Sequence, residues 1–291
     1  MSRILAIDLG GTQLRAALCD SGNPVALDPA GTWPAPKDLK GFRQHVAALI
    51  ADHDARRLGI AVPGTVAGTT CLWIPNLPYL DGVDLAALFP AVEIGLGHDA
   101  QLALLAEATA GAAEGLSDVL LVAIGTGIGS AVLAGSRIVR GSSGSACSFG
   151  WACADLSDEG HDRDGWLERH VSGRALDRIG GKAGFRDGFG LVEAARKGNA
   201  AAISALVAPT RALGVSLAGA VALLDPQAVV LSGGVAAAAD VLVAPVMDAM
   251  RRQLPPHLRG VRITAGSFGP NASLTGAAIA GARGLEWDRI R

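Results

Sequence analysis

Two segments of the chain carry the residue types that bind phosphate. Residues 4–18 (ILAIDLGGTQLRAAL) and 120–133 (LLVAIGTGIGSAVL) each join two apolar runs through a Gly/Thr-rich turn. This pattern predicts a β-hairpin around a turn that needs glycine. Glycine leaves the backbone N–H groups open to an anion, because no Cβ blocks the approach. Two such turns, about 115 residues apart, suggest duplicated halves that hold one polyphosphate.

The first turn also offers a ligand for the cation that accompanies a polyphosphate. Asp8 is a hard oxygen ligand of the kind that suits Mg²⁺. Taken singly, each turn fits a plain tight hairpin equally well, with Asp8 as a solvated side chain. The candidate phosphate residues are Asp8, Gly10, Gly11 and Thr12 in the first turn, and Gly125, Thr126, Gly127 and Gly129 in the second.

A third glycine turn lies in residues 231–235 (LSGGV), where an apolar strand meets a predicted helix. Gly233 and Gly234 would let a ligand approach the N–H groups at the start of that helix. The alternative is a turn that only packs the helix on the strand. Three glycine turns at predicted strand ends together indicate nucleotide binding, and none matches the Walker pattern, which requires GK[ST].

Asp99 follows an apolar strand and precedes a helical segment rich in alanine and leucine. At or near a helix N-cap, an aspartate contributes about 1 kcal/mol to stability. A carboxylate there could instead orient and deprotonate a substrate hydroxyl. Phosphoryl transfer needs little covalent help, so one carboxylate in line with the γ-phosphate and a Mg²⁺ would suffice. From these residues alone, both roles stay open.

Composition restricts the class of protein. The chain has 291 residues, of which 50% are apolar and 39 are glycine, as is typical of a loop-rich α/β enzyme. A net charge of -2 without a basic run argues against a nucleic-acid partner. The start lacks a long apolar stretch, so we expect no signal peptide. The most apolar window, Ala212 to Leu224, is too short to span a bilayer, and we expect a soluble cytoplasmic protein.

Apolar periodicity predicts the elements that position these residues. For the first half, the expected strands are 3–9, 13–19, 57–62, 69–74 and 91–96, with helices at 38–53 and 100–113 and a Pro/Gly-rich stretch at 22–36. For the second half, we expect a hairpin at 118–134, a polar segment at 141–165, strands at 227–231 and 261–265, and helices at 165–179, 190–197, 200–224, 235–252 and 272–284.

Both halves contain a strand hairpin followed by α and β elements. This repetition predicts an α/β fold of two domains with a cleft between them. We place the N-terminal domain at 1–113, completed by the C-terminal helix 272–291. The larger C-terminal domain would then occupy residues 114–271.

The ordered series of motifs resembles the ROK family of sugar kinases, which have the actin-like (ribonuclease H-like) ATPase fold. The motifs cover nearly the whole chain: DLGGTQLRAAL, AVPG (61–64), IPNLP (74–78), HDAQLALLAE (98–107), IGTGIGS (124–130), GWLERHVSGRAL (165–176) and LSGGV. The resemblance implies phosphorylation of a hexose by ATP and Mg²⁺, as in a glucokinase, on the 6-hydroxyl. It also implies a homodimer.

The resemblance assigns roles to individual residues. Asp99 would be the catalytic base, and Asp8 would hold Mg²⁺ through water. The implied nucleotide-binding residues are Asp8, Gly10, Gly11, Thr12, Gln13, Gly125, Thr126, Gly127, Gly233 and Gly234. The implied sugar-binding positions are Gly64, Asn76, His98, Asp99, Ser148, Trp151 and Glu168. Among these, Asn76 and Glu168 match the family's sugar ligands.

Three departures from the family pattern fall at the sugar-binding positions. His98 stands where the family usually has Asn, and residues 148–151 read Ser-Phe-Gly-Trp where it usually has Glu-x-Gly-His. Ser148 removes a charged acceptor for two sugar hydroxyls, worth about 1.5–3 kcal/mol. Trp151 offers a flat apolar face that could stack on a sugar ring, or could simply fill the core.

The family's cysteine-rich zinc motif is absent, and Trp166 stands at the position of its last cysteine. The four cysteines form no CxxC pair, so we expect free thiols. Without structural zinc, packing must hold the loop 141–165. The expected aromatic anchors are Phe149, Trp151 and Trp166. A replacement zinc site would use Cys147, Cys153 and His161, although their spacing matches no common site.

Three functions compete. The first is a sugar kinase, with glucose as the default substrate and N-acetylated hexoses next. The altered sugar positions leave open a nucleotide- and sugar-binding regulator that has lost catalysis, although Asp8, Asp99 and all three glycine turns are retained. A ROK transcriptional repressor would need a helix-turn-helix ahead of the kinase motifs. Only seven residues precede Asp8, so we expect no such repressor.

Overall fold

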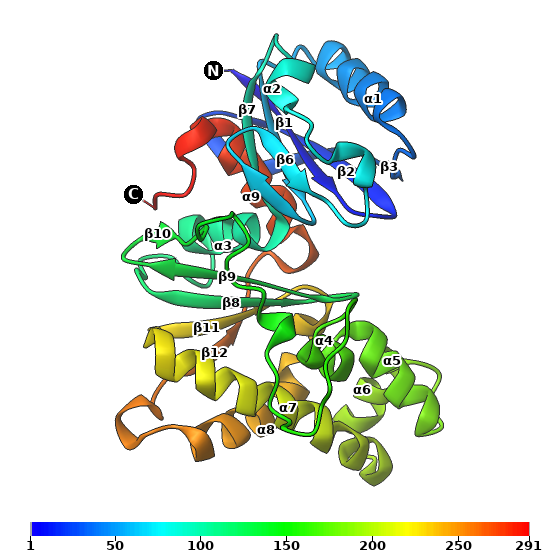
Figure 1. Cartoon of the computed structure of the whole chain (residues 1–291), viewed down its shortest axis with the longest axis vertical. Helices are drawn as coiled ribbons and strands as arrows, with labels where there is room; N and C mark the ends of the chain where they lie inside the picture. The colour runs from blue at the N-terminus through cyan, green and yellow to red at the C-terminus, as the bar shows by residue number, and fades with distance from the viewer. Residues whose placement is uncertain (1, 291) are drawn as a thin grey trace. The chain divides into compact units, whose positions relative to one another are not determined.

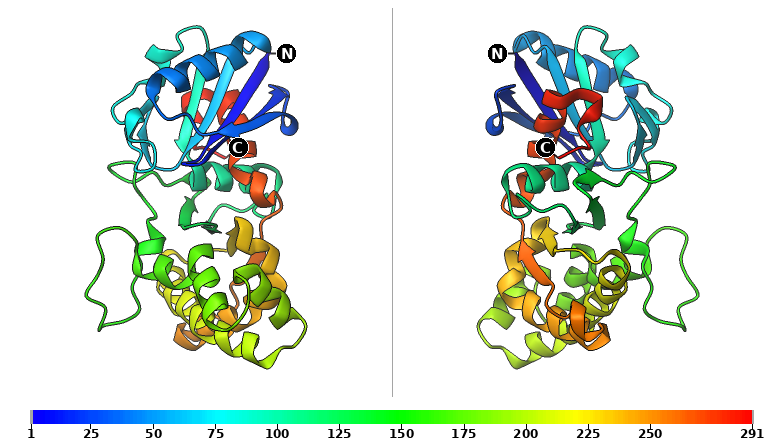
Figure 2. Two further views of the ribbon diagram at one scale, coloured as in Figure 1. Left: turned by 90° about the vertical axis from the view of Figure 1, so that its right-hand side faces the viewer. Right: turned by 90° about the vertical axis from the view of Figure 1, so that its left-hand side faces the viewer.

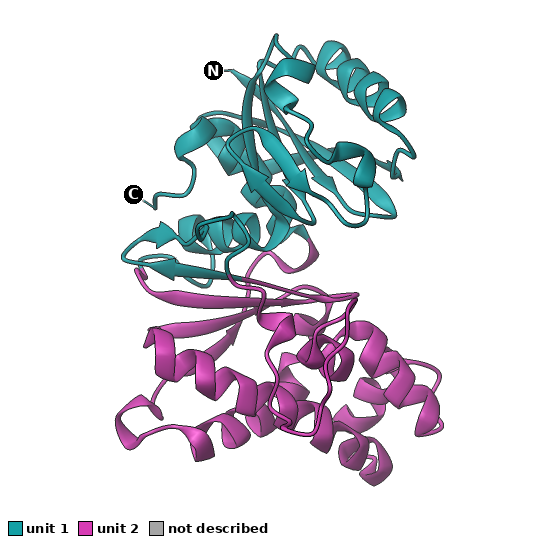
Figure 3. Ribbon diagram, in the orientation of Figure 1, with its two compact units in different colours: residues 1–115, 131–146, 271–291 teal, residues 116–130, 147–270 magenta. Residues whose placement is uncertain are grey.

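The computed structural model describes residues 2–290, which divide into two compact units, coloured separately in Figure 3. Unit 1 comprises the residues up to Gly115, Ala131–Ala146, and the residues from Asn271 onward; the remainder is unit 2. Ala131–Ala146 therefore groups with unit 1, whereas the sequence interpretation places it in the C-terminal domain. The predicted domain boundaries stay a prediction, because compactness alone does not define a functional domain.

Unit 1 is built on a five-stranded sheet with the order β3-β2-β1-β4-β7 (Figure 1). Its strands are β1 (Arg3–Leu9), β2 (Gln13–Asp20), β3 (Asn23–Pro34), β4 (Arg57–Val62) and β7 (Glu93–His98). β1 pairs antiparallel with β2 and parallel with β4, and β4 pairs parallel with β7. The carboxyl ends of β1, β4 and β7 therefore meet at one edge of the sheet, which is where ligands bind in such folds.

Helices cover both faces of this sheet. Alternate strand residues point to opposite faces, so neighbouring residues of β1 show which helix covers which face. α1 (Leu39–Asp52) packs into the buried cluster that contains Leu5 of β1. α9 (Ala272–Arg283) lies against Ile4, the next residue on the opposite face. α3 (Asp99–Ala110) packs on α9.

The backbone of α9 rests directly on the sheet because glycines stand at the contact. A Cβ on Gly59 of β4 would lie 1.7 Å from the carbonyl oxygen of Ala277. A Cβ on Gly95 of β7 would lie 2.1 Å from the carbonyl oxygen of Ala280. Both neighbours are backbone atoms inside a helix, so they cannot turn aside as a flexible side chain would. The close packing of α9 therefore requires glycine at both positions.

β3 is a strand that the sequence interpretation missed, since it treats residues 22–36 as a Pro/Gly-rich stretch. Pro24, Pro29 and Gly31 all lie within the strand. β3 forms the edge of the sheet and pairs on one side only, with irregular register. An edge position tolerates proline because the missing N–H need not reach a second neighbour.

Between β4 and β7, unit 1 contains small elements that carry the IPNLP motif. They are β5 (Thr65–Ala67), β6 (Thr70–Trp73), η1 (Pro78–Leu80) and α2 (Leu85–Leu88). β5 and β6 form an antiparallel pair. The predicted strand at 69–74 is thus confirmed as the shorter β6.

Unit 2 contains three strands that pair in parallel, β8 (Val119–Ile124), β11 (Ala228–Ser232) and β12 (Arg262–Ala265). With β9 (Ile128–Ala134) and β10 (Arg137–Ile138), the sheet order is β10-β9-β8-β11-β12. β9 begins in unit 2 and continues into unit 1. The predicted hairpin and both later strands are confirmed.

The helices of unit 2 are α4 (Trp166–Val171), α5 (Gly173–Lys182), α6 (Gly188–Arg196), α7 (Ala200–Leu224) and α8 (Ala239–Gln253). The prediction of one helix over 165–179 is wrong, because the chain breaks at Ser172. Its backbone is extended (φ -60°, ψ 164°), and its hydroxyl accepts a hydrogen bond from the Ala175 N–H at 3.3 Å as the N-cap of α5. Short 3₁₀ turns complete the chain: η2 (Phe149–Trp151), η3 (Gly234–Ala238), η4 (Pro256–Leu258), η5 (Gly269–Asn271) and η6 (Gly284–Glu286).

α7 is long and apolar enough, by length and composition, to cross a membrane. The window 212–224, taken as too short in the sequence, is the second half of this helix, whose predicted bounds 200–224 are confirmed. Half of its most apolar window is buried inside the structure. Leu213 and Leu217 are among its buried side chains. The core helix of a soluble protein passes the same test, so α7 is weak evidence for a membrane span.

Candidate active site

The candidate residues form two groups, one in each unit. The unit 1 group is Asp8, Gly10, Gly11, Thr12, Gln13, Gly64, Asn76, His98 and Asp99. The unit 2 group is Gly125, Thr126, Gly127, Gly129, Ser148, Trp151, Glu168, Gly233 and Gly234. Each group is described within its own unit.

Asp8 lies near the end of β1 and is paired rather than solvated. It stands opposite Arg15 in the β1–β2 register, and the Arg15 guanidinium forms an ion pair with its carboxylate. The side chain of Asp8 is only 15% exposed. Burial raises the pKa of Asp8 above its usual range, Arg15 opposes the rise, and the negative charge of Asp99 adds to it. The alternative of a solvated aspartate is therefore wrong.

The first glycine turn closes tightly and touches the IPNLP segment. The Gly10 N–H donates to the Gln13 carbonyl oxygen at 2.9 Å. A Cβ on Gly11 would lie 2.9 Å from the Cβ of Asn76. Gly11, Thr12 and Gln13 are exposed. The structure therefore brings a predicted phosphate turn and a predicted sugar ligand into direct contact.

Asn76 is presented by a rigid turn. Its neighbours Ile74 and Leu77 are buried, and the Leu77 N–H donates to the Ile74 carbonyl oxygen at 2.9 Å. Asp81 accepts from the Ile74 N–H at 2.7 Å. Asn76 itself is exposed. Gly64 lies behind this segment, where a Cβ would stand 2.3 Å from the carbonyl oxygen of Trp73.

Asp99 is the first residue of α3, and its two carboxylate oxygens differ in environment. Oδ1 accepts from the Ala100 N–H at 2.6 Å and lies 3.2 Å from Nε2 of His98. Oδ2 has no hydrogen bond to the residues that the structure describes. The side chain is 40% exposed. Local groups thus fix Asp99 through one oxygen and leave the other available to a substrate hydroxyl.

The second glycine turn, in unit 2, is held by the junction between α4 and α5. Within the turn, the Gly125 N–H donates to the Gly127 carbonyl oxygen at 3.0 Å. From the junction, the Gly173 N–H donates to the Gly125 carbonyl oxygen at 2.7 Å. Nε of Arg174 donates to the Thr126 carbonyl oxygen at 3.1 Å. The turn is therefore preorganised before any ligand binds.

Glu168 of α4 lies beside this turn. Its Oε2 accepts from the Ile128 N–H at 3.2 Å, and its Oε1 pairs with Arg174 at 2.9 Å. A Cβ on Gly127 would lie 2.9 Å from Oε1, so a larger residue would collide with the carboxylate. Both oxygens of Glu168 therefore already have partners, and a sugar hydroxyl would have to share them.

Ser148 and Trp151 lie at η2, next to the same turn. A Cβ on Gly150 would stand 3.0 Å from the Ile128 carbonyl oxygen and 3.3 Å from Oε2 of Glu168. Trp151 is 52% exposed, so the expectation that it anchors the loop is wrong. Its ring is free to contact a ligand instead.

Trp166 is 8% exposed and stacks on His170, with ring centroids 4.4 Å apart. The loop that precedes it extends from unit 2 without regular secondary structure (Figure 2). Polar turns hold this loop: Asp158 pairs with Arg169 at 2.8 and 3.0 Å, which lowers the pKa of Asp158. His161 Nδ1 accepts two backbone N–H groups at 3.1 Å.

The proposed replacement zinc ligands are not brought together. Across residues 2–290, no group of three His, Cys, Asp or Glu side chains is placed to hold a metal ion. Cys153 is exposed and lies 3.2 Å from the Asp155 carbonyl oxygen.

The third glycine turn lies beside the second. Gly233 has φ +77°, and a Cβ there would stand 2.6 Å from the carbonyl oxygen of Ile124, which precedes Gly125. Gly234 faces open space and begins η3, not an α-helix. Gly233 is thus required for packing, and Gly234 remains the open position next to the turn at 125–127.

Two polar residues of these groups were missed in the sequence. A hairpin that turns at residues 10–12 places Arg15 opposite Asp8, so the sequence could have predicted this ion pair. Arg174 gave no such signal. It follows Glu168 by six residues, a spacing that separates two side chains on a continuous helix. Only the break at Ser172 brings them together.

The chain belongs to the ROK family, whose model matches residues 4–282. It is 32% identical over 290 residues to the bifunctional enzyme NanE/NanK of Brucella melitensis, a match that covers 95% of this chain and 53% of that protein. It is 30% identical over 297 residues to kanosamine kinase of Amycolatopsis mediterranei, covering 95% of each. The chain thus spans about half the length of the first relative and nearly all of the second.

Solved structures give the same result for the fold. The ROK family glucokinase from Streptomyces griseus, in complex with glucose and AMPPNP, has a TM-score of 0.82 to this chain at 26% identity. The match covers 97% of this chain and 100% of that one. The predicted fold class, the two-domain α/β fold of actin-like ATPases, is confirmed.

Proposed function

We propose that this chain is a sugar kinase that transfers the γ-phosphate of ATP to a hydroxyl of a hexose, the 6-hydroxyl. The observation that carries the proposal is the arrangement around Asp99. Oδ1 is held by the Ala100 N–H and by His98, while Oδ2 has no hydrogen bond within residues 2–290. A carboxylate fixed through one oxygen can accept a hydroxyl proton on the other, which is the role of a general base.

The donors near the end of β1 fit a magnesium ion. Asp8 is a carboxylate whose burial raises its pKa, so a nearby cation would relieve the cost of its charge. Arg15 already occupies the carboxylate, which favours an ion held through water rather than directly. When bound, Mg²⁺ would neutralise charge on the phosphates. Exposed backbone at residues 11–13 would face the same phosphates.

In unit 2, the turn at 125–127 would bind phosphate through its backbone, and Gly234 would lie against the adenosine. Gly234 fits this role because it faces open space. The sugar would contact Asn76, which is exposed on a rigid turn, and Glu168 beside the second glycine turn. The exposed ring of Trp151 offers a stacking face in place of a polar contact.

A catalytically impaired regulator is the second candidate. His98 favours it, because it departs from the family pattern and its imidazole lies 3.2 Å from Oδ1 of Asp99, where it competes with a substrate for that oxygen. For either function we propose a cytoplasmic homodimer, in line with the family.

Sugar-dependent ADP release tests the proposal. The full chain would be assayed with ATP and Mg²⁺ against hexoses, N-acetylated hexosamines, other amino sugars and polyols. ADP release with one of these sugars supports a kinase. Calorimetric binding of ATP and a sugar without any ADP release would support the regulator. Absence of ATP binding would contradict both.

A further inference from the structure

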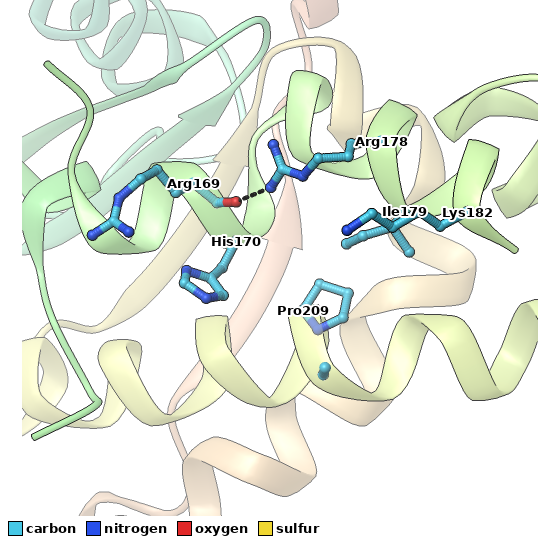
Figure 4. A pocket seen from close by; sticks show the side chains of 7 residues that line it. Arg169, His170, Arg178, Ile179, Lys182 and Pro209 are labelled. Atoms are coloured by element: carbon cyan, nitrogen blue, oxygen red, sulfur yellow. Dashed lines mark hydrogen bonds between the residues drawn. The ribbon is translucent and has the colours of Figure 1, made fainter. Parts of the chain in front are cut away.

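A hollow in unit 2 lies between α4, α5 and α7 and contains none of the candidate site residues (Figure 4). Its volume is about 470 Å³, within the range of pockets that hold small molecules. The lining residues are Arg169, His170, Arg178, Ile179, Lys182, Ala208 and Pro209. The lining includes three cations and a histidine but no carboxylate.

Two of the cations are not neutralised. Arg169 is paired with Asp158, so its charge is balanced. Arg178 and Lys182 are exposed, form no ion pair with any residue in 2–290, and lie one turn apart on α5. Like charges at this spacing repel each other. The negative end of the α5 helix dipole stabilises the charge of Lys182 in part, because Lys182 is the last residue of the helix. Arg178 lies one turn further from this end.

Arg178 and His170 are held in place within the hollow. An N–H of Arg178 donates to the carbonyl oxygen of Arg169 near the end of α4. His170 stacks on Trp166, and its Nδ1 lies 2.7 Å from the Trp166 carbonyl oxygen. A carbonyl only accepts, so Nδ1 carries a proton and Nε2 is the remaining polar atom of the ring. Groups fixed in this way lose little freedom when a ligand binds.

The remaining wall is apolar. Ile179 of α5 and Ala208 and Pro209 of α7 form it. Figure 4 shows Arg178 and Lys182 extending from α5 and Pro209 from α7, with the Arg178 guanidinium directed at the Arg169 carbonyl oxygen. An occupant that combines a compact negative charge with a small organic body would match both parts of this lining.

We propose that this hollow binds a small phosphate monoester, whose dianionic group contacts Arg178 and Lys182 and whose organic body packs on Ile179, Ala208 and Pro209. The planar fork of an arginine matches the oxygens of a phosphate. A dianion balances the two unpaired cations without excess. The site is distinct from the proposed kinase site, and its existence does not depend on that function. Its α4 and α5 are also the helices that hold the turn at 125–127, so occupancy would stabilise this helix pair.

The test is calorimetric titration of the full chain with glycerol 3-phosphate, and with neutral glycerol for comparison. We expect the Arg178→Gln/Lys182→Gln variant to lose one binding site, or to bind at least tenfold more weakly. The matched control is Arg252→Gln/Lys197→Gln, which removes two exposed cations from the ends of α8 and α6. This control should bind within twofold of the wild type.

Circular dichroism and thermal unfolding would confirm that both variants fold, as expected for exposed positions. Arg178→Lys is a second test variant, because it keeps the positive charge but loses the planar guanidinium. It should weaken binding less than Arg178→Gln/Lys182→Gln does. Unchanged binding by the Arg178→Gln/Lys182→Gln variant would overturn the proposal. So would equal binding of glycerol, or no binding of glycerol 3-phosphate at millimolar concentration.

Discussion

Replacing Asp99 by asparagine separates the hydrogen bond of Asp99 to the first turn of α3 from base catalysis. Oδ1 accepts from the Ala100 N–H at 2.6 Å, and an asparagine carbonyl oxygen can accept the same bond. Asp99 is the first residue of α3, and His98 is the N-cap, so a capping role for Asp99 is not confirmed and the substitution leaves the cap residue unchanged. The free energy of unfolding should therefore change by less than about 0.5 kcal/mol, as for an ordinary surface substitution.

Catalysis should respond very differently. A neutral amide at the position of Oδ2 cannot take a proton from a sugar hydroxyl. General base catalysis contributes about 10²–10⁴-fold, which is about 2.7–5.4 kcal/mol of transition-state stabilisation at 1.36 kcal/mol per factor of ten. We therefore expect Asp99→Asn to lower kcat at least about a hundredfold. ATP affinity should stay close to that of the wild type.

The assays are coupled ADP release with the true substrate, calorimetry with ATP, and thermal unfolding. Asp99→Ala is the matched control: it should lose the same activity and also about 1 kcal/mol of stability, because it removes the hydrogen-bond acceptor for the Ala100 N–H. Near-wild-type turnover by Asp99→Asn would refute the reasoning and leave Asp99 with a structural role alone.

Three further predictions concern stability, thiols and metal. Gly59→Ala should prevent folding of unit 1, because its Cβ would lie 1.7 Å from the Ala277 carbonyl oxygen. A Cβ on Gly219 of α7 would meet no other atom, so Gly219→Ala should raise the free energy of unfolding by up to about 1 kcal/mol. Denaturant unfolding of both variants measures the difference. A stably folded Gly59→Ala would contradict the packing of α9 on the sheet. Burial raises the pKa of Cys19 to about 11 and of Cys71 to about 12, from 9.0. As pH rises, the two thiols ionise in the unfolded chain before they ionise in the folded protein. Their burial therefore contributes fully to the free energy of unfolding below pH 9, and this contribution is lost as pH rises towards 11 and 12. Iodoacetamide at neutral pH should label the exposed Cys153 in the native protein, and Cys19 and Cys71 only after denaturation; native labelling of the buried pair would disprove their burial. Elemental analysis should find no stoichiometric zinc, and one zinc per chain would show that Cys147, Cys153 and His161 form a site after all.

Strands and long helices were the predictable part of this fold. β1 and β4 coincide with their predicted bounds, because their apolar runs end abruptly at glycine or proline. β3 was missed because its prolines are tolerated only at a sheet edge, and sequence does not reveal which strand is the edge. The helix break at Ser172 was missed because the apolar periodicity continues across it.

The environment of the candidate residues was much less predictable than their identity. The motifs gave Asp8 and Asp99, but not the burial that raises the pKa of Asp8. Nothing in the sequence showed that Oδ1 of Asp99 is occupied and Oδ2 is not, because that depends on one helix turn and one imidazole. Trp151 was expected to be an anchor and is exposed, since polar turns hold the loop instead.

The most direct test of the proposed kinase is ³¹P NMR of the full chain with ATP, Mg²⁺ and the hexose that best promotes ADP release. The proposal predicts a growing phosphomonoester signal of the sugar phosphate, matched in amount by ADP, whose rate of growth falls at least about a hundredfold in Asp99→Asn. Loss of ATP to inorganic phosphate alone, or a sugar phosphate signal that grows at near the wild-type rate in Asp99→Asn, would contradict it.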